Sequence, residues 1–300
     1  MAMIRLMSIE SWSEAIHELS IIVPIFNGEK YIKQKLESLT GIEEVSYEII
    51  IALNKSTDKS EELVDLYSTN IPNLTIIRQS SYLSGLENYH SGYRIAKGAF
   101  TMASAVDDIC DKHFYREAIN IMIASKGVCA VAPITRFSND SHGNKPIDFE
   151  LLGTEKERLT CLFENIRVSH GIFYSLMRHE VAADLNRNYF KDYQIIGADW
   201  LFDIKLALKG EIYRTKKSKC VFGVDGVSKN TKGLIYQGSN WFSKVFPYWS
   251  LARGILKMAL EQDKKIAITL LRFATSLLIG NLHRYYHYHR DGTRNTRVVD

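Results

Sequence analysis

Ala99 to Phe114 read AFTMASAVDDICDKHF, an apolar run followed by two adjacent acidic residues. The part from Phe100 to Val106 has the length and apolar content of a buried strand, and a helix is expected to begin near Asp111. Asp107 and Asp108 would then stand at the carboxyl end of a buried strand, where open α/β sheets bind ligands. Two carboxylates there could hold a divalent cation that also binds phosphates. The alternative is that Asp108 and Asp111 only cap the following helix.

The chain before this stretch alternates short apolar runs with segments of helical spacing. Leu19 to Ile25 and Tyr47 to Leu53 are predicted strands, followed by predicted helices over Glu29 to Leu39 and Ser60 to Tyr67. Further predicted elements are strands at Leu74–Ile77 and Val128–Ile134 and helices at Leu86–Ala96 and Phe114–Ser125. This alternation implies right-handed βαβ crossovers and a mostly parallel sheet.

The regular alternation stops after Ile134. Arg136 to Leu159 is polar and rich in turn residues, and we predict a long loop over one face of the sheet, with a disordered excursion as the alternative. Ala198 to Leu208 is a predicted helix that ends at Lys209-Gly210. Two strands are expected after it, at Glu211–Tyr213 and Lys219–Val224.

The last third of the chain, Trp241 to Arg290, is predicted to be helical and is rich in aromatic residues. Ile266 to Leu282 is strongly apolar, but Arg272 interrupts it and it is shorter than the roughly 20 residues that a membrane-spanning helix needs. Asp263-Lys264-Lys265 and the run HRYYHYHR at 283–290 flank it, a composition that suits a helix lying in a lipid interface. The alternative is a helical hairpin that packs on the domain or on a second subunit.

The bulk composition is that of an ordinary globular protein. With 46% hydrophobic residues, 24% charged residues and a net charge of +4, the chain gives no argument for a nucleic-acid partner. Cys110, Cys129, Cys161 and Cys220 are widely spaced, and we expect them to be reduced and structural, which favours the cytoplasm. The first 18 residues lack the apolar core of a signal peptide, so we expect the protein to stay inside the cell.

Several short motifs occur in an order that resembles the family 2 glycosyltransferases. The resemblance covers about residues 18–230, and its strength lies in the succession of motifs before the acidic pair. The motifs are SIIVPIFNG (Ser20–Gly28), EIII (Glu48–Ile51), NKSTDKS (Asn54–Ser60), LSGLEN (Leu83–Asn88) and AKGAF (Ala96–Phe100). The resemblance implies an α/β fold of GT-A type, a mostly parallel sheet flanked by helices, with a nucleotide-sugar-binding catalytic domain over 1–235. The composition of the tail predicts a C-terminal helical extension over 236–300 that contacts a membrane surface or another subunit.

The resemblance also implies metal ligands and a catalytic base. Asp107 corresponds to the last acid of the family's Asp-x-Asp motif and Asp108 to the acid that commonly follows, so both are predicted ligands of Mg²⁺ or Mn²⁺. Ala105 stands where the first acid is usual, which weakens the case for tight metal binding. Asp199, in Gly197-Ala198-Asp199-Trp200, matches the late acidic motif and is the predicted base that takes a proton from the acceptor hydroxyl. A simple helix cap is the alternative for Asp199.

The predicted donor-binding residues follow the same resemblance. They are Pro24, Phe26, Asn27, Asn54, Asp58, Asn88, Asp107 and Lys229. Leu53 stands where the family usually has an Asp that can accept a hydrogen bond from uracil, so either the base is not uridine or Asn54 and backbone groups replace that contact. Lys229 lies in a loop that resembles the one closing over the diphosphate, and it would supply positive charge to the leaving group.

The resemblance implies an inverting glycosyltransferase. It would move a sugar from a nucleoside diphosphate donor to a glycan or lipid-linked acceptor, in bacterial envelope polysaccharide biosynthesis, in the cytoplasm or at the inner face of the cell membrane. The second hypothesis is a non-catalytic sugar-nucleotide-binding or scaffold protein of the same fold. It is motivated by Leu53 and Ala105, which occupy two usual acid positions.

Overall fold

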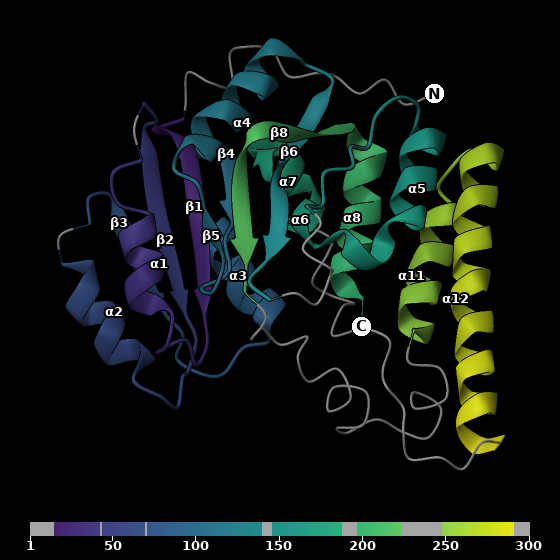
Figure 1. Ribbon diagram of the computed structural model, residues 1–300, viewed down its shortest axis with the longest axis horizontal. Helices are drawn as coiled ribbons and strands as arrows, with labels where there is room; N and C mark the ends of the chain where they lie inside the picture. The colour runs from purple at the N-terminus through teal and green to yellow at the C-terminus, as the bar shows by residue number, and fades with distance from the viewer. Residues whose placement is uncertain are drawn as a thin grey trace.

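A computed structural model describes residues 15–42, 44–69, 71–139, 146–187, 197–223 and 248–280, and the backbone of 281–290. Its centre is an eight-stranded sheet of order β3-β2-β1-β4-β7-β6-β8-β5, with helices on both faces (Figure 1). The predicted mixed α/β architecture is therefore confirmed.

One half of the sheet is entirely parallel. It consists of β1 (His17–Ile25), β2 (Tyr47–Leu53), β3 (Leu74–Arg78) and β4 (Gly98–Ala103). In β1, Ile21 stands opposite Ile49 of β2 on one side and Met102 of β4 on the other. All three side chains are fully buried, because helices cover both faces of a parallel sheet. This explains the unbroken apolar runs in the sequence.

The other half of the sheet is mixed. β6 (Val128–Phe137) and β8 (Glu211–Phe222) are parallel to each other, whereas β7 (Leu176–Arg178) is antiparallel to both β4 and β6. β5 (Ile109–Cys110) is antiparallel to β8. The prediction of two strands between Glu211 and Val224 is wrong, because β8 is continuous through the polar interval. A register shift against β6 accommodates that interval, and the Glu117 carboxylate accepts hydrogen bonds from the backbone of Lys216 to Ser218.

Two apolar clusters lie on opposite faces of the sheet. Helices α1 (Ile32–Ser38), α2 (Ser60–Ser68) and α4 (His113–Ala124) contribute to one cluster. Helices α3, α5, α7, α8, α11 and α12 contribute to the other. Their bounds are α3 Gly85–Tyr93, α5 Glu155–Glu164, α6 His170–Phe173, α7 His179–Arg187, α8 Ala198–Lys209, α11 Trp249–Ala259 and α12 Lys264–Arg290, with a 3₁₀ turn at Ile166–Val168.

The segment Arg136–Leu159, predicted to be a loop, ends in helix. α5 begins at Glu155, and Thr154 and Glu157 form a reciprocal capping box at its start. The sequence contains the threonine-x-x-glutamate spacing of a capping box. The apolar periodicity after it is weak and the surrounding residues are polar, so the segment resembled a loop. Residues 140–145 of this segment lie outside the described residues.

The C-terminal helices pack on the rest of the chain. The Phe273 ring of α12 stacks on Phe163 of α5 with a centroid distance of 3.9 Å, and Tyr248 stacks on Trp200 of α8. Figure 1 shows α12 as the outermost element on the side away from α2. The predicted boundary between residues 235 and 236 lies outside the described residues. No helix in the described part of the chain has the length and apolar content needed to cross a bilayer.

The prediction of four reduced cysteines is wrong. Cys110 and Cys220 form a disulfide, while Cys129 and Cys161 are free. The two bonded cysteines are 110 positions apart in the sequence and become neighbours because β5 pairs with β8, with Cys110 opposite Cys220. Cysteine usage therefore no longer supports a reducing compartment.

Candidate active site

The acidic pair lies in a tight turn between β4 and β5. β4 ends at Ala103, and the Asp108 amide donates a hydrogen bond of 3.1 Å to the carbonyl of Ala105. The side chain of Asp108 is buried, and its Oδ1 accepts a 3.0 Å hydrogen bond from the amide of Gly223 at the end of β8. The turn that presents the acids is therefore joined to a strand far away in the sequence.

Gly223 also lies against the second acid of the pair. A Cβ atom built on Gly223 would stand 2.1 Å from Oδ2 of Asp107, closer than any real contact. Only glycine fits at this position unless the acidic turn moves. The end of β8 and the Asp107 carboxylate thus form one wall of the site.

A buried lysine forms hydrogen bonds to this turn from the interior of the protein. Lys35 of α1 is 1% exposed, and its Nζ donates hydrogen bonds to Oγ of Ser104 at 2.5 Å and to the carbonyl of Asp108 at 2.6 Å. Burial lowers the pKa of Lys35 to about 8, although the negative charges of Asp108 and Asp107 oppose this. Burial likewise raises the pKa of Asp108 to about 7, against the effect of the Lys35 charge. Lys35 was not among the predicted site residues, because nothing in its local sequence distinguishes it from the other lysine of α1.

Asp199 lies in the first turn of α8, as predicted. Gly197, with φ of 80°, occupies the cap position, and no side chain caps this helix. Burial raises the pKa of Asp199, whereas the charge of His170 and the backbone amide of Trp200 lower it. His170, to which no role was assigned from the sequence, therefore favours the ionised form of Asp199 when its ring is charged.

A second carboxyl group lies one turn further along α8. Asp203 is fully buried, and its Oδ2 accepts a 2.6 Å hydrogen bond from Oγ of Ser169. Its Oδ1 has no hydrogen-bond partner among the described residues. Burial, with a further contribution from the charge of Asp199, raises the pKa of Asp203 well above its usual value. The spacing of four residues between Asp199 and Asp203 was the signal in the sequence for this pair.

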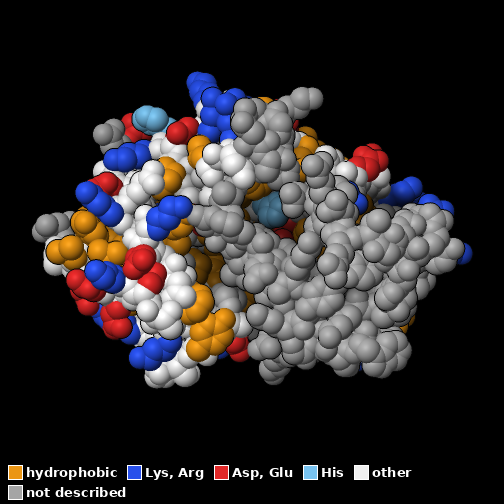
Figure 2. Space-filling view, turned by 60° about the horizontal axis from the view of Figure 1, so that its bottom comes forward, with side chains coloured by type: hydrophobic (Ala, Val, Ile, Leu, Met, Phe, Trp, Pro, Cys, Tyr) orange, Lys and Arg blue, Asp and Glu red, His pale blue; other side chains and the backbone are white. Residues whose placement is uncertain are grey.

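The charges of Asp107, Asp108 and Asp199 all act on the same buried side chain, Tyr174. Burial raises the pKa of Tyr174, and the negative charges of Asp108, Asp107 and Asp199 all raise it further. The Tyr174 ring packs edge-to-face on Phe222, next to the Gly223 wall. The structure therefore brings Asp107, Asp108 and Asp199 near one another. Figure 2 shows the molecule from the side that lies at the bottom of Figure 1, where a histidine and an acidic side chain are visible in a hollow.

The described residues supply few protein ligands for a metal ion. No group of three or more His, Cys, Asp or Glu side chains converges within the part of the chain that the structure describes. Asp107 and Asp108 provide hard oxygen atoms, which suit Mg²⁺ or Mn²⁺ when phosphates and water complete the coordination. These two residues fit a cation that arrives with a diphosphate.

The loops after β1 and β2 are bound to each other by several of the predicted donor-binding residues. Oδ1 of Asn27, which has φ of 50°, accepts a 2.8 Å hydrogen bond from the Thr57 amide. The two carboxylate oxygens of Asp58 accept hydrogen bonds of 3.0 Å from the amides of Glu29 and Ser60. These side chains shape the rim of the sheet.

Asn54 and Asn88 also contact the backbone. Nδ2 of Asn54 donates to the Leu83 carbonyl at 2.7 Å, and its Oδ1 accepts from the Leu83 amide at 3.0 Å. Nδ2 of Asn88 donates to the carbonyl of Ala52 at 2.7 Å. Both residues hold the segment after β3 against β2, and direct contact with a donor remains a prediction for them.

Aromatic side chains line the rim between β1 and β3. Phe26 and Tyr82 are both exposed, and their rings meet edge-to-face with a centroid distance of 5.2 Å. Tyr82 was not among the predicted residues, although an aromatic residue in a polar loop after a strand was a usable signal. Pro24 lies within β1, half-buried, and Lys229 lies outside the described residues.

Comparison with known proteins identifies the family. A sequence model of the family described as Glycosyl transferase family 2 matches residues 20–185, more than half of the chain. The minor teichoic acid biosynthesis protein GgaB of Bacillus subtilis is 26% identical over 268 residues, which is 85% of this chain and 28% of GgaB. The abequosyltransferase RfbV of Salmonella typhimurium is 29% identical over 97 residues, 31% of this chain and 29% of RfbV. The chain thus spans less than a third of these relatives.

Solved structures share the fold. S. aureus TarS 1-349 in complex with UDP has a TM-score of 0.59 at 17% identity, covering 92% of each chain. The mannosyltransferase PcManGT from Pyrobaculum calidifontis, in complex with GDP-Man and Mn²⁺, has a TM-score of 0.54 at 13% identity, covering 92% of this chain and 76% of PcManGT. The predicted GT-A fold is confirmed by these likenesses. The family match over residues 20–185 shows that this chain belongs to glycosyl transferase family 2.

Proposed function

We propose that this chain is an inverting glycosyltransferase that moves a sugar from a nucleoside diphosphate donor to a glycan or lipid-linked acceptor. The observation that carries the proposal is the grouping of Asp107, Asp108 and Asp199 around Tyr174. The group lies at one edge of the parallel sheet, where α/β folds bind nucleotides.

The donor nucleoside would bind at the rim formed by the loops after β1 and β2. The exposed Phe26 and Tyr82 rings offer a surface on which a flat base can stack. TarS structures hold UDP and UDP-GlcNAc, which supports a uridine donor despite the Leu53 replacement. Asn27, Asn54, Asp58 and Asn88 would act by fixing the loops around the nucleoside.

The diphosphate would lie beside Asp107 and Asp108. These two carboxylates would hold Mg²⁺ or Mn²⁺ together with the phosphate oxygens, and PcManGT in complex with GDP-Man and Mn²⁺ supports this choice of ion. When bound, the cation would neutralise charge on the departing diphosphate. Lys229, which follows β8 in the sequence, would add positive charge to the same group.

Asp199 would act as the general base. The acceptor hydroxyl oxygen forms a bond to the anomeric carbon while the bond from that carbon to the diphosphate oxygen breaks, and the hydroxyl proton passes to Asp199. The raised pKa of Asp199 makes it a stronger base than an exposed aspartate, and the charge of His170 opposes part of this rise.

The acceptor belongs to the bacterial envelope in this proposal. GgaB takes part in minor teichoic acid biosynthesis and RfbV is an abequosyltransferase, and both relatives support a polymer or lipid-linked glycan as acceptor. Such an acceptor would place the protein in the cytoplasm at the inner face of the cell membrane.

Asp199→Asn tests the reaction. We expect the rate of sugar transfer to fall by about 10²- to 10⁴-fold, the contribution usual for a general base, with donor affinity unchanged in calorimetry. Asp184→Asn is the matched control, because Asp184 lies on α7 in an exposed ion pair with Lys209. Transfer by Asp199→Asn at the parental rate would remove the base assignment.

The second hypothesis, a non-catalytic sugar-nucleotide-binding protein, is supported by Leu53 and Ala105, which occupy two usual acid positions. A panel of UDP, GDP and dTDP sugars with and without Mn²⁺ separates the two. Binding of a donor with neither hydrolysis nor transfer to any acceptor would favour the binding protein.

A further inference from the structure

The hairpin of α11 and α12 has a buried face and an outward face. Ile266, Leu270, Phe273 and Ala274 of α12 are buried in the cluster shared with α5, α8 and α11. Their spacing places them along one side of the helix, so the opposite side points away from the protein. Figure 1 shows this hairpin at the edge of the molecule, with α12 running toward the end to which the parallel strands point.

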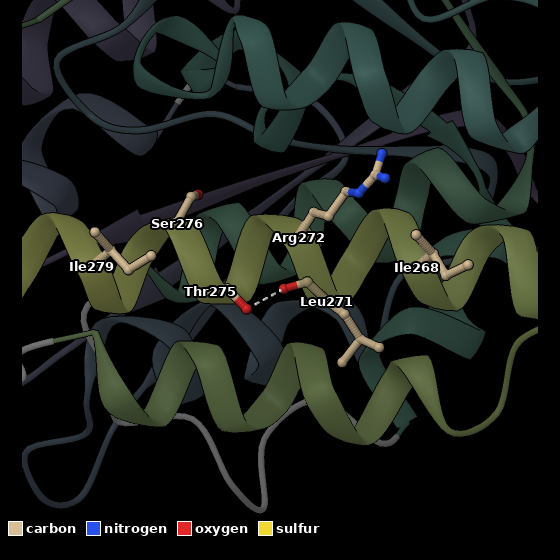
Figure 3. A pocket seen from close by; sticks show the side chains of 6 residues that line it. All are labelled: Ile268, Leu271, Arg272, Thr275, Ser276 and Ile279. Carbon is tan, nitrogen blue, oxygen red and sulfur yellow. Dashed lines mark hydrogen bonds between the residues drawn. The ribbon is translucent and has the colours of Figure 1, made fainter.

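The outward side of α12 carries large apolar side chains. Ile268 is 40% exposed, Leu271 is 41% exposed and Ile279 is 60% exposed. Together with Arg272, Thr275 and Ser276 they line a shallow pocket. Figure 3 shows the six side chains spread along α12, with Leu271 and Thr275 on the side of α11 and Arg272 and Ser276 on the other side. α11 extends the apolar surface with exposed Trp249, Leu256 and Leu260.

The charged residues within the two helices of this hairpin are all basic, whereas the connection between the helices carries Glu261 and Asp263. α11 and α12 contain seven Lys and Arg residues and no Asp or Glu, so the rest of the chain has a formal charge of −3 although the whole chain has +4. Lys264, Lys265 and Arg272 are exposed and share the side of α12 that carries Ile268. The nearby Asp263 caps α12, because its Oδ1 accepts hydrogen bonds from the amides of Lys265 and Ile266.

This combination favours a lipid surface over a second copy of the chain. Two-fold pairing brings the same face of both copies together, which would place basic residues against basic residues with no acid in either helix. Apolar side chains between cations suit the headgroup region of an anionic bilayer. There the apolar side chains are buried and the cations contact lipid phosphate groups. No described helix is apolar and long enough to cross the bilayer, so contact in the plane of the surface remains.

We propose that the outward face of α12, with the exposed end of α11, docks this chain on an anionic membrane surface. The contact would hold the site of Asp107, Asp108 and Asp199 near a lipid-linked acceptor. This consequence of docking rests on the proposed function. Docking itself needs neither donor nor chemistry. An inactive protein would therefore still bind vesicles.

Vesicle flotation of the full chain tests the apolar part of the face. We expect binding to vesicles that contain phosphatidylglycerol, weak binding to pure phosphatidylcholine, and release by added salt. The double variant Ile268→Asn with Ile279→Asn should lose at least about tenfold in partitioning, because the buried apolar area is removed. Leu66→Asn with Ile123→Asn is the matched control on α2 and α4, where exposed fractions are 61% and 53%, and it should bind like the parent.

The basic part is tested in the same way. Lys264→Gln with Lys265→Gln should weaken binding to the anionic vesicles by at least about fivefold, because two cations are removed from the surface that meets the headgroups, whereas Lys97→Gln with Lys126→Gln should not. Circular dichroism checks that each variant is folded. Equal binding by the parent and both face variants would overturn the proposal. So would a parental dimer in light scattering that Ile268→Asn with Ile279→Asn converts to a monomer.

Two further readouts separate this proposal from the proposed function. Asp199→Asn should bind vesicles like the parent, and the face variants should transfer sugar to a water-soluble acceptor at the parental rate. Loss of transfer to the soluble acceptor in the face variants would overturn the separate docking role. If the parent binds vesicles but transfers no sugar, the docking proposal stands and only the proposed enzymatic function is contradicted.

Discussion

The amide of Gly223 donates a hydrogen bond of 3.0 Å to Oδ1 of Asp108, and this bond joins the end of β8 to the acidic turn after β4. Because Gly223 also stands against the Asp107 carboxylate, both acids depend on one glycine for their placement. The two sides of the proposed diphosphate site therefore move together. The first prediction concerns this contact.

Gly223→Ala should weaken metal-dependent donor binding by at least about tenfold, since a displaced carboxylate loses a charge-assisted contact of the kind that contributes about 1.5–3 kcal/mol. The new methyl group would overlap Asp107, so the acidic turn must move. Gly85→Ala is the control, because nothing lies within 4 Å of a Cβ at that position. Calorimetry with nucleotide and Mn²⁺ measures both variants, and parental affinity in Gly223→Ala would contradict the prediction.

Lys35→Met should lower the free energy of unfolding by about 1–3 kcal/mol, because Ser104 and the Asp108 carbonyl lose their hydrogen-bond donor in a buried site. Lys33→Met, on the exposed side of the same helix, should change it by less than about 0.5 kcal/mol. Urea unfolding followed by circular dichroism compares the two. Equal effects of the two substitutions would show that the buried ammonium does not support the turn.

The raised pKa of Asp199 predicts the acid limb of the pH profile. The base must be ionised to accept a proton, so kcat/KM should fall as the pH decreases, with a midpoint above the roughly 3.9 of an ordinary aspartate. The charge of His170 lowers this pKa, and His170→Gln should therefore move the limb to higher pH. His113→Gln, on the surface of α4, serves as control. A limb that stays in place in His170→Gln would contradict this electrostatic link.

Tyr82→Ala should weaken nucleotide binding by about tenfold, since stacking of a base on an aromatic ring contributes roughly 1–3 kcal/mol. The Phe26 ring would remain as the second part of the surface. Leu66→Ala, also exposed but on α2, should leave nucleotide affinity unchanged. Thermal shift with a nucleotide panel gives the comparison, and an unchanged shift in Tyr82→Ala would place the base elsewhere.

The parallel half of the sheet could be predicted because each of its strands is recognisable from a short segment of sequence. Leu19 to Ile25 and Tyr47 to Leu53 are unbroken apolar runs, and a strand buried on both faces needs such a run. The order of motifs then indicated the family, and the position of Asp199 at the start of α8 followed from it.

The features that the sequence did not reveal depend on which elements become neighbours. Lys35 occupies an ordinary helical position, and only the packing of α1 under the acidic turn makes it a buried cation. Cys110 and Cys220 meet because β5 pairs with β8, a pairing that no local pattern encodes. In the sequence, Asp203 is one of several polar residues of α8. Only the fold shows that it is buried and accepts a hydrogen bond from Ser169.

The grouping of Asp107, Asp108 and Asp199 as a donor site is tested most directly by calorimetric titration of the donor nucleotide into Asp107→Asn, with and without Mn²⁺. The account predicts that Mn²⁺ strengthens nucleotide binding to the parent and to Asp184→Asn, and that Asp107→Asn loses at least about tenfold of this gain. Equal Mn²⁺ dependence in the parent and in Asp107→Asn would contradict it.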